Sequence, residues 1–475
     1  MARTPLYELL ALEIEQAVLL GRLPPGVSLP SLRECAAQRS LSLNTVTAAY
    51  RLLEDRGLIE ARPQSGFYVR STLPEPRRSL RSAPAIAVAK GQEDLMAQVL
   101  EAQRQPGYID LAFAGPRGKR FYPGERLARI SASLLRHKPD IVSAYALPPG
   151  SPLLRQQIAK RAVRLGMELD SEQIILTHGA VEALQLALRA VTRPGDQVAV
   201  EAPSYFNLYP LLDSLGLKAL ELPTHPSTGL DMDAVEAVFT SSQVAALVTM
   251  PTVHNPLGCS MPVESKERLA RLAATTEVPV IEDAIYAELQ FQAVLQPTVK
   301  AFDRKGWVMV CSGFSKTLAP DYRIGWMEGG RFCRTIRRLK FTSSASESML
   351  LSETLGAFLA SGGYEHHLKA LRRLYQAQVS TVRSHVARHF PAGTRATQPE
   401  GGFLLWVEIP KGVDSLDLFR AALSERIVIM PGQVYSSGAR YRHCIRLSCC
   451  QELDDRFMDA IEKLGQLCGA LSIVG

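Results

Sequence analysis

The chain has 475 residues, 46% of them hydrophobic and 21% charged, with a formal net charge of +7. These values are ordinary for a globular protein, and the length suggests about three domains with a large buried core. No apolar run reaches the roughly 18 residues of a membrane helix, and the N-terminus has no apolar secretion signal. We therefore expect a cytoplasmic protein without a membrane partner.

The eight cysteines form no CxxC pair. Cys449 and Cys450 are adjacent and the others are scattered through apolar segments, so we expect reduced thiols in the core and no metal site. The positive charge alone is weak evidence for an anionic partner, since a solvated surface accounts for it equally well. The cluster of Arg77, Arg78 and Arg81 would suit contacts with phosphate.

Residues 1–72 are predicted to form three helices followed by a two-stranded hairpin. The first helix carries an apolar stripe of Leu6, Leu9, Leu10, Ile14 and Val18 and stops near Gly21, ahead of a Pro-Pro-Gly turn. The second and third helices are separated by a tight turn, and the two strands are joined by a tip that ends at Gly66. This order is that of a winged helix-turn-helix. The expected elements are helices over 6–18, 30–39 and 43–56 and strands over 58–61 and 67–69.

The third helix would enter the major groove of DNA by its N-terminal residues Ser42, Asn44 and Thr45. Ser42 is suited to cap the helix and to offer its first amides to a phosphate, and Asn44 is suited to contact a base edge such as that of adenine. Arg33 would reach the DNA backbone or a base, and Gly66 would let the wing tip approach a sugar-phosphate closely. The pattern alone also fits a helical oligomerisation module.

Residues 4–69 resemble the GntR-type winged helix over their whole length, with motifs such as Gly21-Arg-Leu-Pro-Pro-Gly and Ser42-Leu-Asn-Thr-Val-Thr-Ala-Ala-Tyr-Arg-Leu-Leu-Glu. Many relatives carry an arginine where this chain has Leu43, so an operator sequence cannot be carried over. The residues that the resemblance places on DNA are Arg33, Ser42, Asn44 and Thr45.

Residues 73–100 are rich in Pro, Arg, Ser and Ala without a sustained period and are predicted to be a linker. Beyond them, apolar runs alternate with helical stretches, which indicates a largely parallel sheet covered by helices on both faces. The C-terminal part mixes helices and strands, such as 403–408 and 444–448, and indicates a smaller α+β lobe. The expected strands of the large sheet are 174–177, 197–200, 245–250, 278–282 and 308–311.

One lysine, Lys316, follows the last of these strands in Cys-Ser-Gly-Phe-Ser-Lys316-Thr-Leu-Ala-Pro-Asp-Tyr-Arg323. A charged lysine amine directly after a buried strand would be poorly hydrated, which is energetically unfavourable. Its position makes sense if its amine is bonded to a ligand and Arg323 holds the phosphate of that ligand. Pyridoxal phosphate (PLP) is bound in this way, through a Schiff base and a phosphate clamp.

Polar residues at the ends of other strands would complete such a site. Asp283 ends a strand where ligands bind in α/β sheets, and it would keep a pyridine nitrogen protonated. The alternative for Asp283 is a helix N-cap. Tyr286 and Asn255 would hydrogen-bond the phenolate oxygen of the ring, although core packing and an ordinary Asn-Pro turn explain them as well.

The loop Thr177-His-Gly-Ala-Val joins a strand to a helix, and the backbone amides of Gly179, Ala180 and Val181 would hold a phosphate there. An ordinary βα loop is the alternative. Tyr205 follows another strand and would stack on the ring.

The order of these pieces resembles that of fold-type I aminotransferases from about residue 110 to the C-terminus. The resemblance implies that PLP is the cofactor and is bonded to Lys316, with Ser315 and Arg323 on the phosphate. It implies that Tyr145, in Tyr-Ala-Leu-Pro-Pro-Gly, reaches the phosphate in the partner subunit's site of a homodimer. It also implies that Arg446, in Cys-Ile-Arg-Leu-Ser, grips the α-carboxylate of an amino acid.

Two departures from this family concern the geometry of the site. Gly313 stands where relatives often carry a phosphate-binding Ser or Thr, so that contact would be lost or passed to Ser312. In residues 115–123 relatives usually carry Pro-Asp after the glycine, which leaves the substrate side of the site undefined.

A GntR-type winged helix joined by a linker to an aminotransferase-like domain resembles the MocR subfamily of bacterial transcription regulators. The resemblance implies a regulator that binds PLP and double-stranded DNA, in which PLP or an amino acid or amine effector alters operator affinity. The implied α/β architecture is a winged helix over 1–72, a linker over 73–100, and a fold-type I domain over 101–475, with a large part at about 140–345 and a small part at about 101–139 and 346–475.

Two alternatives stay open at this point. The retained lysine, aspartate and arginine permit transamination, so the protein would be an active aminotransferase that carries a DNA-binding domain. A PLP protein whose winged helix does not bind DNA is disfavoured by Arg33 and the cluster at 42–45. The sequence indicates neither the target genes nor the effector nor the sign of regulation.

Overall fold

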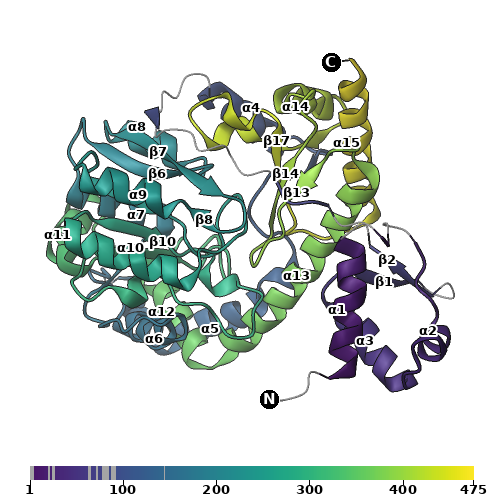
Figure 1. Cartoon of the computed structure of the whole chain (residues 1–475). Coiled ribbons are helices and arrows are strands. Elements are labelled where there is room, and N and C mark those ends of the chain that lie inside the picture. The colour runs from purple at the N-terminus through teal and green to yellow at the C-terminus, as the bar shows by residue number, and fades with distance from the viewer. Residues whose placement is uncertain are drawn as a thin grey trace.

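The computed structural model describes residues 5–19, 22–23, 27–62, 66–70, 73–76, 85–86, 92–143 and 145–474. Figure 1 shows the winged helix as a lobe beside the long helix α13 (Gly363–His389), which runs from the large α/β lobe to the smaller α+β lobe. The predicted stop at Gly21, the turn at 24–26, the wing tip at 63–65 and the arginines at 77–81 lie outside the described residues.

The predicted winged helix-turn-helix is confirmed. Its core lies between α1 and α3, where Leu10, Ile14 and Tyr50 are buried. Leu6 and Leu9 are exposed although the sequence placed them on the same stripe, because α3 covers only the face of α1 that carries Leu10 and Ile14. The elements are α1 (Leu6–Leu19), α2 (Leu32–Arg39), α3 (Leu43–Asp55), β1 (Ile59–Arg62) and β2 (Gly66–Val69).

The large lobe is built on a nine-stranded sheet in the order β3-β7-β6-β9-β10-β11-β12-β5, with β8 paired to β7. The neighbours from β7 to β11 run parallel, as predicted, whereas β12 is antiparallel to both β11 and β5. The strands are β3 (Ala85–Ile86), β5 (Ile174–Thr177), β6 (Gln197–Ala202), β7 (Lys218–His225), β8 (Gly229–Leu230), β9 (Ala246–Thr249), β10 (Val280–Asp283), β11 (Val308–Gly313) and β12 (Gly325–Glu328).

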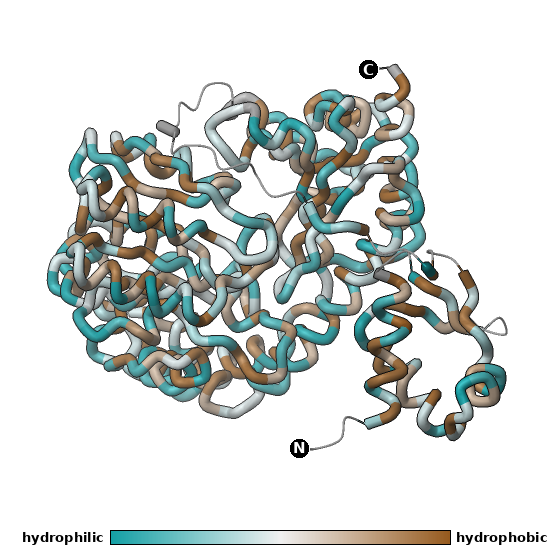
Figure 2. The backbone as a smooth tube through the Cα atoms, viewed as in Figure 1, coloured by the Kyte–Doolittle hydropathy of each residue, from teal (hydrophilic) through white to brown (hydrophobic). Residues whose placement is uncertain are grey.

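Helices cover both faces of this sheet (Figure 1), so every residue of β9 and β10 is buried. Figure 2 shows the corresponding hydrophobic residues along the central strands. This burial explains why the strands appear in the sequence as near-continuous apolar runs. The helices of the large lobe are α5 (Gly124–His137), α6 (Pro152–Ala162), α7 (Gly179–Val191), α8 (Leu208–Ser214), α9 (Met232–Thr240), α10 (Val263–Thr276), α11 (Cys333–Ser343) and α12 (Met349–Ala360).

The smaller lobe has a four-stranded antiparallel sheet in the order β13-β14-β17-β16 and a separate parallel pair, β15 with β4. Its core includes buried residues of α4, α13, α14 and α15. The elements are α4 (Gln92–Arg104), β4 (Ile109–Asp110), β13 (Arg395–Ala396), β14 (Leu404–Glu408), α14 (Ser415–Ser424), β15 (Ile427–Val428), β16 (Met430–Pro431), β17 (Cys444–Ser448) and α15 (Asp455–Val474).

The prediction that residues 73–100 form a linker without regular structure is wrong at two places. β3 pairs with β7 at the edge of the large sheet, and α4 begins at Gln92. Val99 and Ala102 of α4 are buried in the core of the smaller lobe. The helix is therefore stabilised by tertiary packing, which a local sequence pattern does not report.

No helix of the described residues is long and apolar enough to cross a membrane. Within the same residues, no group of three or more His, Cys, Asp or Glu side chains is arranged to hold a metal ion. All eight cysteines are free thiols and are buried, as predicted.

Candidate cofactor site and DNA-binding surface

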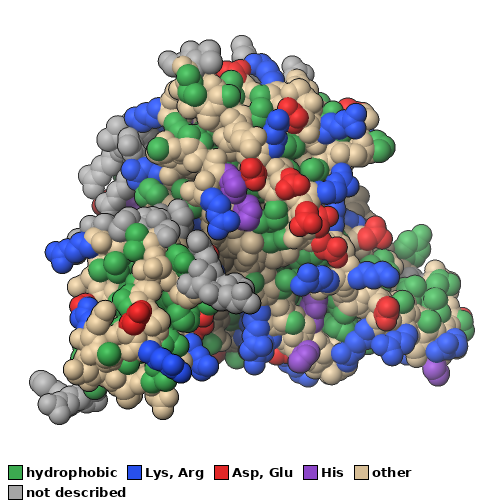
Figure 3. Space-filling view, turned by 90° about the vertical axis from the view of Figure 1, so that its right-hand side faces the viewer, with side chains coloured by type: hydrophobic (Ala, Val, Ile, Leu, Met, Phe, Trp, Pro, Cys, Tyr) green, Lys and Arg blue, Asp and Glu red, His purple; other side chains and the backbone are tan. Residues whose placement is uncertain are grey.

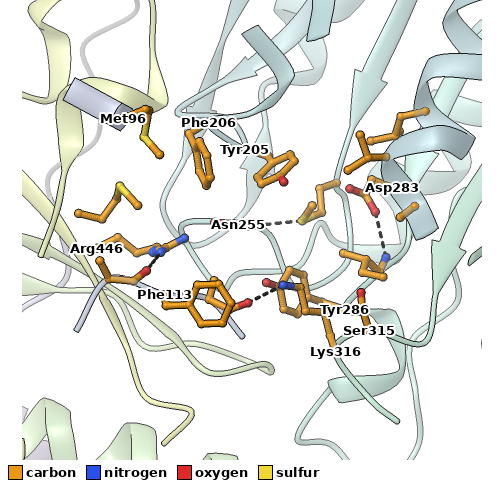
Figure 4. A pocket seen from close by; sticks show the side chains of 18 of the residues that line it. Met96, Phe113, Tyr205, Phe206, Asn255, Asp283, Tyr286, Ser315, Lys316 and Arg446 are labelled. Carbon is orange, nitrogen blue, oxygen red and sulfur yellow. Dashed lines mark hydrogen bonds between the residues drawn. The ribbon is translucent and has the colours of Figure 1, made fainter. Parts of the chain in front are cut away.

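The parallel strands β6, β9, β10 and β11 end at one edge of the large sheet, where ligands of α/β proteins bind. The segments that follow these ends carry Tyr205, Asn255 and Lys316, and Asp283 is itself the last residue of β10. The sequence places these residues far apart, and the parallel topology brings them to one cavity of about 230 Å³ between the two lobes (Figure 4).

All the residues predicted for the cofactor and its amino acid partner line this cavity, except Gly179 and Tyr145. Those that line it are Ala180, Val181, Tyr205, Asn255, Asp283, Tyr286, Ser315, Lys316, Arg323 and Arg446.

The apolar part of the cavity was not predicted from the sequence. Met96 and Leu100 come from α4, within the stretch assigned to the linker, and their spacing of four residues on a helix was the available signal. Phe206 directly follows the predicted Tyr205. Further lining residues that were not predicted are Gln103, Ala112, Phe113, Ala114, Leu184, Met250, Ile285 and Met430.

One end of the cavity is suited to an anion. Helix α7 begins there without a side-chain cap, so its first backbone amides are free to bind a ligand. Ser315 and Arg323 line the same cavity. Gly179 lies directly against Arg323, because a Cβ atom at Gly179 would be 2.7 Å from Nη2 of that arginine. Gly179 therefore gives the guanidinium access to the start of α7.

Gly313 has a packing role that the sequence did not reveal. A Cβ atom there would lie 3.2 Å from Cα of Gly325 and 3.5 Å from the backbone nitrogen of Ala180. The suggestion that Ser312 takes over a phosphate contact is wrong, because the Ser312 hydroxyl donates to the Ala284 carbonyl at 3.2 Å and Ser312 lines a different cavity. Neighbouring residues of a strand point to opposite faces, so Ser312 cannot replace Gly313.

Lys316 has an amine that is tuned toward its neutral form. Burial lowers its pKa to about 8, and the positive charges of Arg446 and Arg323 act in the same direction. The amine donates a hydrogen bond to the backbone carbonyl of Ala114, which also lines the cavity. A neutral lysine amine is a nucleophile, so Lys316 is suited to form a covalent bond with a carbonyl ligand.

Asp283 has the opposite response to the same environment. Burial raises the pKa of its carboxyl to about 7, against a hydrogen bond of 3.0 Å that Oδ1 accepts from the backbone of Ile285. The alternative of a helix N-cap is not found, because the short helical turn that follows, Ala287–Leu289, has Tyr286 at its N-cap position. The bond to Ile285 uses one carboxylate oxygen of Asp283. A positively charged ligand nitrogen beside Asp283 would favour the ionised carboxylate. Burial and the nearby Asp283 also raise the pKa of Tyr205, to about 12.

Asn255 and Tyr286 lie between these groups. The side-chain oxygen of Asn255 is buried and has no hydrogen-bond partner among the described residues. Tyr286 is buried and packs edge-on against Phe403, with ring centroids 5.5 Å apart. Tyr286 therefore packs in the core, as the alternative interpretation predicted, and this packing places its ring at the wall of the cavity.

Arg446 is a buried cation of the site with incomplete hydrogen bonding. Its side chain is fully buried, and Nη2 donates to the carbonyl of Ala112. Its Nε and Nη1 atoms have no partner among the described residues. A buried guanidinium with two unpaired nitrogens is costly unless an anion binds it, and a carboxylate matches its geometry. Tyr435 supports the group from one face, 5.6 Å from ring centroid to guanidinium carbon.

Tyr145 lies outside this cavity, with 81% of its surface exposed in the single chain. The structure of one chain therefore does not bring it to the site that the other predicted residues form.

On the winged helix, Ser42 caps α3 as predicted, because its hydroxyl accepts a hydrogen bond of 3.1 Å from the backbone of Thr45. Its hydroxyl also lies 2.8 Å from that of Thr45. Arg33 in the first turn of α2 and Asn44 in the first turn of α3 are exposed. Gly66 has a φ of +98°, a conformation that glycine adopts freely.

Figure 3 shows basic and acidic side chains mixed over this side of the molecule rather than one continuous basic patch. The net positive charge is thus not concentrated on the face in view. Arg33 and Asn44, which are exposed at the starts of α2 and α3, are better placed to contact DNA than the basic residues as a whole.

Comparison with known proteins gives two family matches. Residues 6–69 match the gntR family of bacterial regulatory proteins, and residues 122–462 match aminotransferase class I and II. The HTH-type transcriptional regulator YdcR of Escherichia coli is 35% identical over 97% of this chain and 98% of its own length. The regulator YjiR of the same organism is 30% identical over 97% and 98%. The chain belongs to the MocR-type GntR regulators.

The aminotransferase-like part of this MocR-type regulator also resembles solved enzymes. Kynurenine aminotransferase of Pyrococcus horikoshii, solved with PMP, superposes with a TM-score of 0.73 and 26% identity, covering 81% of this chain and 95% of that one. The α-aminoadipate aminotransferase LysN of Thermus thermophilus, complexed with a phosphopyridoxyl-leucine, gives 0.73 and 25%, covering 80% and 95%. These likenesses confirm the predicted fold-type I architecture.

Proposed function

We propose that this transcription regulator binds PLP in the cavity at Lys316 and couples the occupancy of that cavity to the DNA affinity of its winged helix. The observation that carries the proposal is the convergence of four features on one cavity. They are a lysine amine tuned toward neutrality, a buried aspartate, an uncapped helix start with Arg323, and a buried arginine with unpaired nitrogens.

These groups fit PLP by their charge and chemistry. When bound, PLP supplies an aldehyde that bonds to an amine and a pyridine ring that draws electrons. Lys316 would provide the amine, and Asp283 would hold a proton on the ring nitrogen. Arg323, Ser315 and the first amides of α7 would hold the phosphate. Among the described charged residues that line the cavity, three are cationic and one is anionic, which favours an anionic ligand.

Other polar and aromatic residues that line the cavity would contact the ring of PLP or an amino acid effector. Asn255 and Tyr286 would hydrogen-bond the phenolate oxygen, and Tyr205 would stack on the ring. Arg446 would hold the α-carboxylate of an amino acid effector.

The first test is the absorbance of the PLP-loaded protein. We expect a visible absorbance band from lysine-bound PLP in the wild type, and its loss in Lys316→Ala. Lys266→Met is a matched control, because Lys266 is also buried with a pKa of about 8 but is held by Thr252 and the Pro297 carbonyl outside the cavity. A band that survives Lys316→Ala, or that never forms in the wild type, would rule out the assignment of this lysine.

The second test concerns DNA. Arg33→Ala should weaken specific operator binding about tenfold or more, since arginine contacts with DNA typically contribute about 1–3 kcal/mol. Arg39→Ala is the matched control on the same helix, because Arg39 is paired with Glu13 at 2.7 Å. If a gel shift shows equal losses for both variants, or none for Arg33→Ala, the assigned DNA contact is wrong.

We further propose a cytoplasmic homodimer. The exposed Tyr145 would reach the phosphate in the site of a second copy, and two winged helices would contact a two-part operator. The eight buried free thiols support a reducing compartment.

The groups around Lys316 also permit transamination, although we do not propose catalytic turnover. A 2-aminoadipate transaminase of Thermus thermophilus is 26% identical over 81% of this chain. Steady-state turnover with an amino donor and a 2-oxo acid distinguishes the two functions, because a sensor stops after one half-reaction.

A further inference from the structure

The cavity at Lys316 has a second, apolar end whose residues have no role in holding the cofactor. Figure 4 shows Met96, Phe113 and Phe206 on the side of Arg446, across from Asp283, Lys316 and Ser315. An amino acid held by its carboxylate at Arg446 and by its amine near Lys316 would therefore direct its side chain among apolar groups. The other apolar residues at this end are Leu100 and Met430.

The charges of the cavity are already assigned. Lys316, Arg323 and Asp283 serve the cofactor, and Arg446 serves the α-carboxylate. Among the described residues that line the cavity, no further cation is left for a side-chain carboxylate and no further anion for a side-chain ammonium. Arg117 stacks on Phe113 at 4.6 Å, but it is already paired with Asp110 at 3.2 Å. Leu100 and Phe113 are partly exposed, so a charged side chain beside them would lose part of its hydration without gaining a free partner.

The amide nitrogen of Gln103, an uncharged polar side chain at this end, is also engaged. It donates to Oδ1 of Asp110 at 3.2 Å. The same Asp110 oxygen accepts from the backbone of Ala112 and Phe113, at 3.0 and 2.9 Å. Gln103 thus helps to shape the turn that carries Phe113.

Along the chain, α4 lies between the winged helix and most of the aminotransferase-like domain. Met96 and Leu100 lie one helical turn apart and line the cavity, while Val99 and Ala102 are buried in the core of the smaller lobe. Leu100 keeps 51% of its surface exposed at this position. Residues 73–91 join α4 to the winged helix, so a ligand side chain that packs on α4 contacts a helix that begins within the stretch predicted as the linker.

We propose that the effector is an amino acid with a single carboxylate and an apolar side chain, and that Met96 and Leu100 of α4 determine this specificity. The inference rests on the proposed function, since it requires PLP at Lys316. It adds the chemical class of the effector and the element that contacts its side chain.

The test is a titration of the PLP-loaded full-length protein with leucine, phenylalanine, glutamate and lysine, followed by the change in cofactor absorbance. Leucine or phenylalanine should bind at least about tenfold more tightly than glutamate and lysine, because burial of an unpaired charge opposes binding. Leu100→Lys should reverse part of this preference, with glutamate gaining and leucine losing about fivefold or more.

Gln98→Lys is the matched control. It adds the same charge to the same helix, but Gln98 is exposed and lies outside the cavity lining, about 200° around the helix from Met96 and Leu100. It should leave all four affinities unchanged.

Two outcomes overturn the inference while PLP binding stands: the loaded wild type prefers glutamate or lysine, or it binds none of the four. If Leu100→Lys keeps an intact cofactor band and the wild-type preference for leucine over glutamate, then α4 does not determine the effector specificity. Absence of the cofactor band in the wild type would instead refute the proposed function itself.

Discussion

At the scale of single residues, the site depends on burial acting in opposite directions on two charges. Burial lowers the pKa of Lys316 to about 8 and raises the pKa of Asp283 to about 7. The first effect favours a neutral, reactive amine, and the second makes the carboxylate dependent on a cationic partner. A protonated pyridine nitrogen is such a partner, so the two residues are matched to one ligand.

These values predict how PLP capture depends on pH. Below about pH 8 the Lys316 amine is mainly protonated and cannot attack an aldehyde, and above about pH 8 it is mainly neutral. The capture rate, measured by stopped-flow absorbance, should therefore rise through about pH 8 and level off above it. Free N-acetyl-lysine is the control, since an ordinary lysine amine titrates near pH 10.4. A protein rate that still climbs at pH 10 would contradict the lowered pKa.

Most of the residues that we propose for the cofactor could be predicted to lie in one cavity, because each follows or ends an apolar strand within a short motif. Lys316, Asp283 and Asn255 are such cases, and the parallel topology then brings them together. Met96 and Leu100 could not be predicted in this way, because they become neighbours of the cavity only through the packing of α4. Ser312 was misjudged because the direction of a side chain depends on the register of β11, which the motif does not define.

At the scale of elements, the close approach of β11, β12 and α7 shapes the anion end of the site. A Cβ atom at Gly325 would lie 2.4 Å from the carbonyl carbon of Gly179, at the start of α7. The antiparallel strand β12 was absent from the prediction, since four residues beginning with glycine carry little strand signal. The absence of a side chain at Gly325 nevertheless allows the start of α7 to pack against β12.

Gly325→Ala should therefore destabilise the protein by about 1–3 kcal/mol, the usual cost of overpacking, and should weaken PLP binding. Thermal or denaturant unfolding measures the first effect, and absorbance titration measures the second. Gly469→Ala is the control: a methyl group added to Gly469 in α15 would meet no atom within 4 Å, so the change should be neutral or slightly stabilising. Equal stability of the two variants would refute the packing argument.

Helix α13 connects the cofactor region to the DNA-binding domain. The Tyr364 hydroxyl lies 2.8 Å from the hydroxyl of Thr317, the residue directly after Lys316, and Nε2 of His367 lies 2.7 Å from the Thr317 carbonyl. Sixteen residues after Tyr364, Ser380 accepts a hydrogen bond of 3.0 Å from Arg70 at the end of the winged helix. The same rigid element thus contacts both functional regions.

At the scale of the whole molecule, the winged helix has its own core, separate from those of the other lobes. A cleft of about 830 Å³ separates it from α13, lined by residues such as Arg56, Arg70 and Arg373. Small polar contacts between domains permit relative motion. The fold class and the order of the domains could be predicted from the sequence, whereas this spacing arises from contacts between residues about 300 positions apart.

We propose above all that occupancy of the cavity at Lys316 changes the affinity of the protein for DNA. The most direct measurement is the fluorescence anisotropy of an operator fragment, selected from a random-sequence pool, titrated with full-length protein with and without PLP. We predict that PLP changes the Kd of the wild type about fivefold or more, the usual range of allosteric coupling. Lys316→Ala should show one Kd in both conditions. Equal wild-type affinities with and without PLP, in samples whose absorbance shows bound cofactor, would contradict the account.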